Sequence, residues 1–168
     1  MIDPSLQLLI LKLRLIVFDF DGVFTDNSVY VSQDGVEMVR CWRSDGLGLR
    51  LLDEVGVRYM VISTEANPVV TLRCKKLKIR CVQGCEDKVS ALEQLLKTEN
   101  ISWEQTGYLG NDINDKGCLE RVTLPMVVQD AYDAVIPLGK LRTTARGGYG
   151  AVREVCDLVH KVKMERPQ

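Results

Sequence analysis

Histidine is nearly absent from this sequence, which has His160 as its only example. That residue stands near the C-terminus beside Lys161 and Lys163, where a basic last turn of a helix accounts for it. A hydrolase whose chemistry depends on histidine is therefore not expected.

Long apolar segments and an excess of charge are missing as well. No apolar run approaches the length of a transmembrane helix, and a formal net charge of −1 gives no general attraction to nucleic acid or to a membrane surface. Residues 6–11 are apolar, but they lack the basic start and the small-residue cleavage site of a signal peptide. We therefore expect neither membrane nor nucleic acid among the partners.

Paired cysteine spacings are also absent. The six cysteines are scattered, and the closest two, Cys81 and Cys85, have no second Cys or His pair nearby. A zinc site is therefore not expected. Scattered thiols of this kind are typical of reduced cysteines in a cytosolic protein, so we expect a cytoplasmic location.

The rest of the composition is that of an ordinary globular protein, with 46% hydrophobic and 27% charged residues. A chain of 168 residues suits one domain with a sizeable core, so we expect a single domain over residues 1–168. Strand-like and helix-like segments alternate along it, which is the pattern of a parallel sheet with helices on both faces. The sequence therefore predicts a Rossmann-like α/β fold.

Apolar patterns and turn residues place the expected elements. Core strands are predicted in the first half of residues 15–26 and at 57–62, 81–82, 106–109, 126–128 and 141–144. Helices are predicted from about 44 to 56 and at 68–77, 88–97, 116–121, 131–136 and 151–163.

Residues 28–31 and 36–42 alternate between apolar and polar side chains around Asp34-Gly35, which predicts a β-hairpin. An isolated hairpin is marginally stable in water. This one carries large apolar side chains at Val29, Val31, Val36, Met38 and Trp42. We therefore expect it to pack against another surface, with a second subunit as the candidate.

The segment LIVFDFDGVFTD at residues 15–26 is where we expect chemistry. A strand buried on both faces runs into Asp19 and Asp21, and Gly22 allows the chain to turn sharply. Ligands of open α/β sheets bind beyond the carboxyl ends of the strands. Two neighbouring carboxylates suit Mg²⁺, which leaves room for a substrate phosphate. An acidic surface turn is the simpler alternative, but an apolar strand that ends in this way favours a site.

The letters DFDGVFTD at residues 19–26 resemble the first motif of the haloacid dehalogenase superfamily, whose phosphatases form an aspartyl-phosphate intermediate. The resemblance implies that Asp19 is the nucleophile. It also implies that Asp21 is the general acid and base, which protonates the leaving oxygen and then activates water. This chemistry is consistent with the residues, because an ionised carboxylate can attack phosphorus. Phosphoryl transfer then depends mostly on positioning and on neutralising charge.

Three later segments fall where the superfamily places its other motifs. The resemblance implies that Ser63 hydrogen-bonds the phosphoryl group and that Lys88 neutralises the charges of aspartate and phosphate. GNDIND at residues 110–115 resembles the motif that completes the metal shell around Asp19 and Asp21. Relatives often have aspartate where this chain has Asn111, so either Asn111 or Asp112 would be the further ligand. Alone, each segment could be a helix cap, a solvated lysine or a helix start, but their order makes the match specific.

The resemblance covers roughly residues 13–158 and narrows to the 3-deoxy-octulosonate 8-phosphate phosphatase family through DGLG at 45–48 and GGYGAVRE at 147–154. It implies a domain without a large cap. It also implies a homotetramer in which the hairpin and the C-terminal tail of a neighbour help to close the active site. Relatives often have arginine at the position of Tyr149, which puts that tail contact in question.

Ser63-Thr64-Glu65 looks more like the branch that acts on nonulosonate 9-phosphates than like the octulosonate branch. A nine-carbon sugar acid has a phosphate at one end and a carboxylate at the other. Arg73 and Lys76 share a helix face and are predicted to bind the carboxylate, while Glu65 accepts hydrogen bonds from hydroxyls. Solvated surface charges would explain Arg73 and Lys76 equally well.

Two functions remain open from the sequence. The first is a Mg²⁺-dependent phosphatase of a sugar-acid phosphate in sialic-acid-type biosynthesis. The second is a phosphatase-like oligomerisation module of an acylneuraminate cytidylyltransferase, with little activity of its own, because the same module occurs fused behind such enzymes. Intact Asp19, Asp21 and Lys88 favour the enzyme, whereas the neutral Asn111 keeps the module possible.

Overall fold

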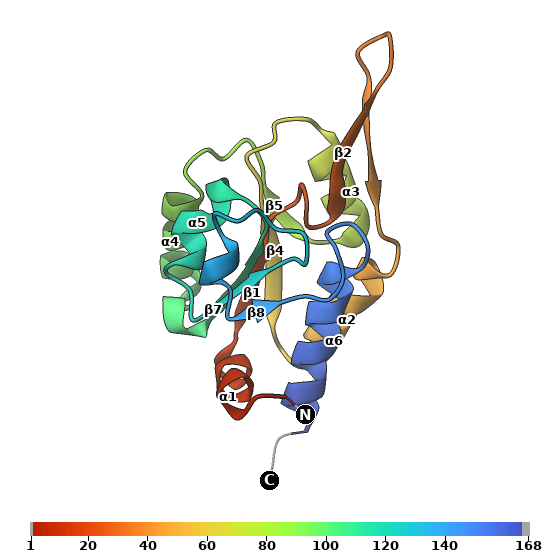
Figure 1. Cartoon of the computed structure of the whole chain (residues 1–168). Coiled ribbons are helices and arrows are strands. Elements are labelled where there is room, and N and C mark those ends of the chain that lie inside the picture. Colours follow the sequence, from red (N-terminus) through yellow and green to blue (C-terminus); the bar gives the residue numbers. More distant parts are fainter. Residues whose placement is uncertain (1, 166–168) are drawn as a thin grey trace.

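Six strands form one parallel sheet in the computed structural model, which describes residues 2–165 (Figure 1). Their order across the sheet is β5-β4-β1-β6-β7-β8, so β1 lies in the interior beside β4 and β6. The strands are β1 (Leu15–Phe18), β4 (Arg58–Ile62), β5 (Arg80–Val82), β6 (Thr106–Gly110), β7 (Leu124–Val127) and β8 (Leu141–Arg142). All residues of β1, β6 and β7 are buried, as expected for strands covered on both faces.

Helices cover both faces of this sheet (Figure 1). On one side lie α2 (Asp45–Glu54), α3 (Val69–Leu77) and α6 (Ala151–Met164), and on the other lie α4 (Lys88–Glu99) and α5 (Lys116–Leu119). The buried apolar residues form one continuous cluster between these layers. The predicted α/β fold is therefore confirmed. No helix in the described residues is both long and apolar enough to cross a membrane.

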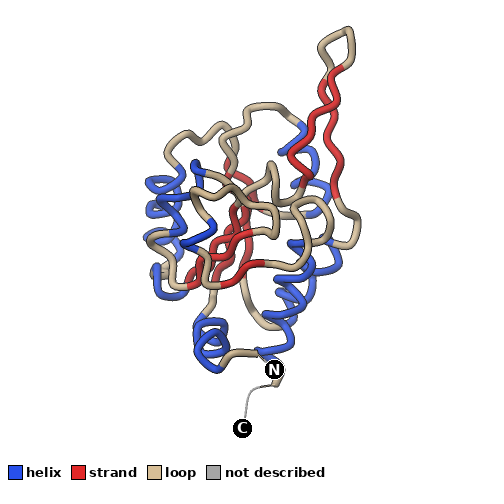
Figure 2. Tube along the Cα trace, in the orientation of Figure 1, coloured by secondary structure: helices blue, strands red, loops and turns tan. Residues whose placement is uncertain are grey.

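The predicted hairpin is confirmed and forms a sheet of its own. Strands β2 (Thr25–Val31) and β3 (Glu37–Cys41) pair antiparallel, and Figure 2 shows them projecting away from the body of the molecule. Most of β2 is exposed to solvent, whereas in β3 only Met38 is exposed and the other residues are half-buried.

Several elements differ from the sequence-based prediction, among them β7, which spans Leu124–Val127 instead of 126–128, and α5, which ends at Leu119 instead of 121. The helix expected at 131–136 is instead a turn followed by the 3₁₀ helix η3 (Ile136–Leu138), in which Pro137 occupies the first turn, where its missing N–H is tolerated. The last strand ends at Arg142 rather than 144. An unpredicted helix, α1 (Pro4–Lys12), lies at the amino end of the sheet, where Asp3 caps it by accepting a hydrogen bond from the Ser5 N–H at 2.7 Å.

Candidate active site

Three neighbouring strands end at the same level and bring the predicted motifs together. Phe18, the last residue of β1, lies opposite Val61 of β4 and Leu109 of β6. Asp19 therefore leaves β1 close to the points at which Ser63 leaves β4 and Asn111 leaves β6. This is the edge of a parallel sheet at which ligands bind.

A buried lysine joins two carboxylates at this edge. Nζ of Lys88, at the start of α4, lies 2.8 Å from Oδ1 of Asp19 and 2.8 Å from Oδ1 of Asp115. Lys88 is 2% exposed, Asp19 3% and Asp115 0%. A charge this deeply buried is tolerated only when it is paired and hydrogen-bonded, so each member of the trio depends on the others.

Asp115 holds this arrangement in place and is the residue that sequence reasoning missed. Besides Lys88, its Oδ1 accepts a hydrogen bond from the Tyr108 hydroxyl at 2.7 Å. Its Oδ2 accepts from the backbone N–H groups of Asn111 at 2.9 Å and Asp112 at 3.3 Å. Both oxygens are therefore occupied within the chain, and Asp115 positions Lys88 and the 110–115 loop. The available signal was its place as the last residue of GNDIND.

The environments of the two motif aspartates shift their proton affinities. Burial raises the pKa of Asp19, the charge of Asp115 raises it further, and Lys88 opposes both effects. Burial also raises the pKa of Asp21, and the neighbouring charge of Glu65 adds to that rise. A carboxyl group with a raised pKa is suited to carry a proton to a leaving oxygen.

Oxygen atoms line a cavity of about 270 Å³ beside Asp19. Its lining includes Asp19, Asp21, Thr64, Asn111 and Asp112. A second hollow of about 280 Å³ shares Asn27 and Asn111 with it, so the two adjoin. Together they provide space for a phosphate group and for the molecule that carries it.

The cavity fits a magnesium ion. Oδ1 of Asn111 is buried and has no hydrogen-bond partner among the described residues, which is costly unless a ligand satisfies it. Asn111 can lie there only because residue 22 is glycine: a Cβ on Gly22 would sit 1.9 Å from the Asn111 Nδ2 atom, and Gly22 has a φ of +77°. Asp19, Asp21 and Asn111 thus offer the oxygen ligands that Mg²⁺ prefers.

Only two of these three candidate ligands are carboxylates. The described residues contain no group of three or more His, Cys, Asp or Glu side chains arranged to hold a metal. Asp112 lines the cavity, but its Oδ1 already accepts the Ile113 N–H at 2.6 Å. Mg²⁺ commonly uses one or two carboxylates and completes its shell with water and substrate phosphate, so the observed set is sufficient.

Ser63 is buried next to this cavity and keeps a hydrogen to donate. Its Oγ accepts a hydrogen bond from the Glu65 N–H at 3.1 Å, which leaves the hydroxyl hydrogen uncommitted. The Glu65 carboxylate accepts from the Asn67 N–H at 2.7 Å, and Asn67 Nδ2 donates to Glu37 of the hairpin at 2.9 Å. Two carboxylates, Glu65 and Glu37, therefore flank Asp21 on its hairpin side.

Arg73 and Lys76 lie in a different place from the other predicted site residues. They line a groove between α2 and α3 that shares no lining residue with the cavity beside Asp19. Nη2 of Arg73 donates a hydrogen bond to the Trp42 carbonyl at 3.0 Å. The structure thus brings Asp19, Asp21 and Lys88 together, and it does not bring Arg73 or Lys76 to them.

An arginine at the base of the hairpin ties the C-terminal glycine loop to the site. Arg40 Nε lies 2.9 Å from Asp26 Oδ2, and its Nη2 donates to the Gly148 carbonyl at 3.1 Å. Its guanidinium lies 4.1 Å from the centre of the Tyr149 ring. The loop is pressed against the first motif so closely that a Cβ on Gly147 would sit 1.9 Å from the carbonyl oxygen of residue 22.

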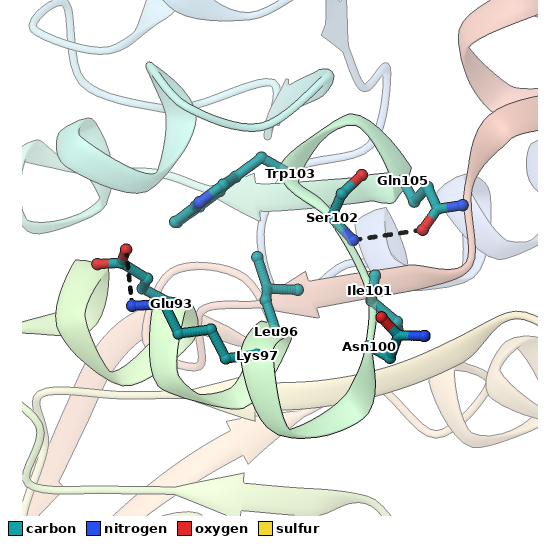
Figure 3. Close-up of a pocket in the computed structure, with 8 residues that line it drawn as sticks. All are labelled: Glu93, Leu96, Lys97, Asn100, Ile101, Ser102, Trp103 and Gln105. Atoms are coloured by element: carbon teal, nitrogen blue, oxygen red, sulfur yellow. Dashed lines mark hydrogen bonds and ion pairs between the residues drawn. The ribbon is translucent and has the colours of Figure 1, made fainter.

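A further pocket, of about 380 Å³, lies beside α4 at the start of β6 (Figure 3). Its charged residues, Glu93 and Lys97, pair with each other at 3.2 Å, and Trp103 forms one wall. No pair of carboxylates converges there. It therefore lacks the chemistry of the cavity beside Asp19.

Comparison with known proteins identifies the family. No family model matches the chain. The 3-deoxy-D-manno-octulosonate 8-phosphate phosphatase KdsC of Salmonella typhimurium is 33% identical over 159 residues, which cover 94% of this chain and 85% of the relative. The chain belongs to the 3-deoxy-octulosonate 8-phosphate phosphatase family. The predicted family and the predicted class, phosphoric monoester hydrolase, are thereby confirmed.

Solved structures of this family have the same fold. The phosphatase from Yersinia pestis is 31% identical, with a TM-score of 0.93 over 98% of this chain and 89% of that chain. The phosphatase from Moraxella catarrhalis, in complex with a magnesium ion, a phosphate ion and a KDO molecule, is 30% identical. Its TM-score is 0.90 over 94% of this chain and 91% of that chain. The Mg²⁺ cofactor predicted from the sequence agrees with that complex.

Proposed function

We propose that this chain is a Mg²⁺-dependent phosphatase that hydrolyses a sugar-acid phosphate through a phosphorylated Asp19. The observation that carries the proposal is the buried contact of Lys88 with both Asp19 and Asp115 beside an oxygen-lined cavity. Bound Mg²⁺, held by Asp19, Asp21 and Asn111, would neutralise phosphate charge. The membership of the chain in a phosphatase family supports the assignment.

In the first half of the reaction, a carboxylate oxygen of Asp19 attacks phosphorus and the bond between phosphorus and the sugar oxygen breaks. Asp21 gives its proton to that leaving oxygen, a role that is favoured by burial, which raises its pKa. Lys88 neutralises the negative charge beside Asp19, and the Ser63 hydroxyl donates to a phosphoryl oxygen.

In the second half, Asp21 is ionised and acts as the base. It takes a proton from water as the water oxygen attacks phosphorus, and the bond between phosphorus and Asp19 breaks. Inorganic phosphate leaves, Asp19 is a carboxylate again, and Asp21 holds the proton needed for the next cycle. Each proton and each bond is thus accounted for by two side chains of the cavity.

The substrate class rests on the space and the charges around the site. The two adjoining hollows accommodate more than a phosphate group, and Glu65 and Glu37 can accept hydrogen bonds from hydroxyls. The Moraxella catarrhalis relative contains KDO, an eight-carbon sugar acid, which supports a substrate of this class. The sequence around Ser63 favours a nine-carbon acid, so nonulosonate 9-phosphate and octulosonate 8-phosphate are the two candidates.

A phosphate-release screen tests this proposal. Both candidates and a small generic phosphate ester are incubated with the chain, with and without Mg²⁺. We expect phosphate release from one of the two sugar-acid phosphates to be at least ~10-fold faster than from the generic ester. A factor of this size corresponds to about one charged contact with the substrate. No release from any of the three would favour the alternative of a phosphatase-like module attached to a cytidylyltransferase.

The same proposal includes a homotetramer in the cytoplasm. The hairpin leaves Val29, Val31 and Met38 exposed, and a large exposed apolar patch usually marks an interface. Carboxylates flank Asp21 on the hairpin side, so a neighbouring subunit is the natural source of a cation for the carboxylate of the substrate.

The carboxylate-binding role of Arg73 and Lys76 stays a prediction. Six free thiols suit a reducing compartment.

A further inference from the structure

A groove of about 590 Å³ lies between α2 and α3, apart from the cavity beside Asp19. It is lined by five cationic side chains and one carboxylate: Arg43, Arg50, Arg73, Lys76, Lys78 and Asp53. The whole chain has a formal net charge of −1, so positive charge is strongly concentrated here. A cleft lined by one sign of charge focuses the electrostatic potential and attracts ligands of the opposite sign.

These five cations are without ion-pair partners in the described part of the chain. Other arginines form ion pairs with nearby carboxylates, among them Arg40, Arg58 and Arg153. The single carboxylate of the groove, Asp53, instead accepts a hydrogen bond from the Tyr59 hydroxyl at 3.0 Å. Asp53 therefore does not pair with any of these cations, although Arg73 lies close enough to the Asp45 carboxylate to oppose the rise in pKa that burial causes there.

Arg73 does not use all its hydrogen-bond donors within the described chain. Its Nε atom is buried and has no hydrogen-bond partner among the described residues, although its Nη2 donates to the Trp42 carbonyl. A buried donor left unsatisfied is costly, so the Arg73 guanidinium has hydrogen-bonding capacity that the described chain does not use.

We propose that this groove binds a small polyanion that carries at least two phosphate or carboxylate groups. The cations come from both walls, Arg50 from α2 and Arg73 and Lys76 from α3, so one anionic group would leave much of the charge unmatched. The volume falls within the range of small-molecule sites. Leu47 and Leu77 supply apolar lining for the body of such a ligand.

This site is separate from the phosphatase reaction. Its lining residues do not include any residue of the cavity beside Asp19. The proposal therefore stands or falls independently of hydrolysis at Asp19. It also gives Arg73 and Lys76 a role that differs from the binding of a substrate carboxylate, and experiment can separate the two roles.

Calorimetric titration of the full chain in Mg²⁺-free, low-salt buffer tests the proposal. Inorganic triphosphate and citrate are the two probes, and they separate phosphate from carboxylate chemistry. The Asp19→Asn chain is titrated in parallel, because a probe that occupies the groove should bind it as tightly as it binds the wild type. We expect one triphosphate or citrate per chain, with binding that weakens as salt increases.

Charge reversal locates the binding. The double variant Arg50→Glu, Lys76→Glu should bind the better probe at least ~10-fold more weakly, because two charged contacts become repulsive. Lys75→Glu is the matched control, since this exposed residue neighbours Lys76 on α3 but does not line the groove. Its affinity should change less than ~3-fold, as expected for one screened surface charge.

Three results would overturn the proposal. One is the absence of binding by either probe to the wild-type chain, and another is an equal loss of affinity in the Lys75→Glu control. The third is selective binding of a polyglutamate peptide with no binding of the small probes, which would make the groove a protein-docking surface. In a separate measurement, an unchanged kcat/KM of the Lys76→Glu variant for the sugar-acid phosphate would show that the groove takes no part in binding the substrate.

Discussion

The carboxyl end of the sheet and the β2–β3 hairpin differ in how far their side chains are buried and paired. At the sheet, Lys88 is 2% exposed and pairs with two carboxylates of the same chain. On the hairpin, Val31 is 65% exposed and Met38 57%, with no apolar surface of the described chain to cover them. The ion pairs of Lys88 are formed within one chain, whereas the apolar side chains of the hairpin are left uncovered by the described residues.

This difference indicates which tasks one chain can perform. Buried charges must be paired, and both carboxylates that pair with Lys88 come from the same chain. Exposed apolar side chains are typical of surfaces that bind another protein, which is the role we propose for the hairpin in assembly. Arg40 connects the two regions, because it joins the base of the hairpin to the glycine loop that presses on the first motif.

The largest effect is expected from replacing Asp19, which pairs with Lys88 at the carboxyl end of the sheet. Asp19→Asn keeps the shape of the side chain but removes the proposed nucleophile, so Mg²⁺-dependent phosphate release should fall by about 10⁴-fold or more. Circular dichroism should show an unchanged fold, which excludes a trivial loss. Near-wild-type turnover in a folded Asp19→Asn chain would contradict the assignment.

Removing the lysine should damage both activity and stability. Lys88→Met leaves Asp19 and Asp115 buried without their cation, a loss of about 3–5 kcal/mol in the free energy of unfolding at neutral pH. Lys97→Met is the matched control on the same helix, since Lys97 is exposed and pairs only with Glu93. It should cost less than about 0.5 kcal/mol in urea unfolding.

The pH dependence of that loss has a definite sign. Burial and the charge of Asp115 raise the folded-state pKa of Asp19 above its unfolded value, and without Lys88, which opposes both effects, this pKa rises further. A raised carboxyl pKa penalises the folded state once the pH exceeds the unfolded pKa. The destabilisation of Lys88→Met should therefore shrink as the pH is lowered from 8 toward about 4. A cost that is constant over this range would show that the lost interaction is packing rather than charge.

Polar changes on the hairpin should act on assembly instead. The double variant Val31→Ser, Met38→Ser removes exposed apolar area, so light scattering should show a shift from tetramer to smaller species at micromolar concentration. Leu72→Ser is the control, because Leu72 is 64% exposed on α3, outside the hairpin. A wild-type chain that is already monomeric would contradict the proposed assembly.

Arg40→Ala should have the smallest effect of these four changes. It should loosen the contact between the base of the hairpin and the glycine loop. Loss of its contacts with Asp26, Gly148 and Tyr149 should speed hydrogen exchange at residues 146–150 by about 10-fold, as local opening becomes easier. Exchange in β1 should be unchanged. Equal acceleration throughout the chain would indicate global destabilisation and not a local link.

Much of the site was predictable because its parts stand in a fixed order along the chain. An apolar strand that ends in Asp19 and Asp21, followed by Ser63, Lys88 and Asn111 at the starts of later segments, maps directly onto the edge of a parallel sheet. The hairpin was equally clear, because alternation around a turn is a local signal.

The parts that escaped prediction depend on tertiary packing. Asp115 could be read as one more metal ligand, and only the fold shows that Lys88, Tyr108 and two backbone N–H groups occupy both its oxygens. The spacing of Arg73 and Lys76 correctly places them on one helix face, but spacing does not say what that face meets.

The central claim is that the phosphoryl group passes to Asp19 before it reaches water, and rapid acid quenching tests this most directly. The chain is mixed with Mg²⁺ and the sugar-acid phosphate that it hydrolyses fastest, quenched within one turnover, digested and examined by mass spectrometry. The account predicts a transient phosphoryl group on the peptide that contains Asp19, formed no later than free phosphate and absent from Asp19→Asn. Complete single turnover with no phosphorylated peptide at any time would contradict it, because water would then attack the substrate directly.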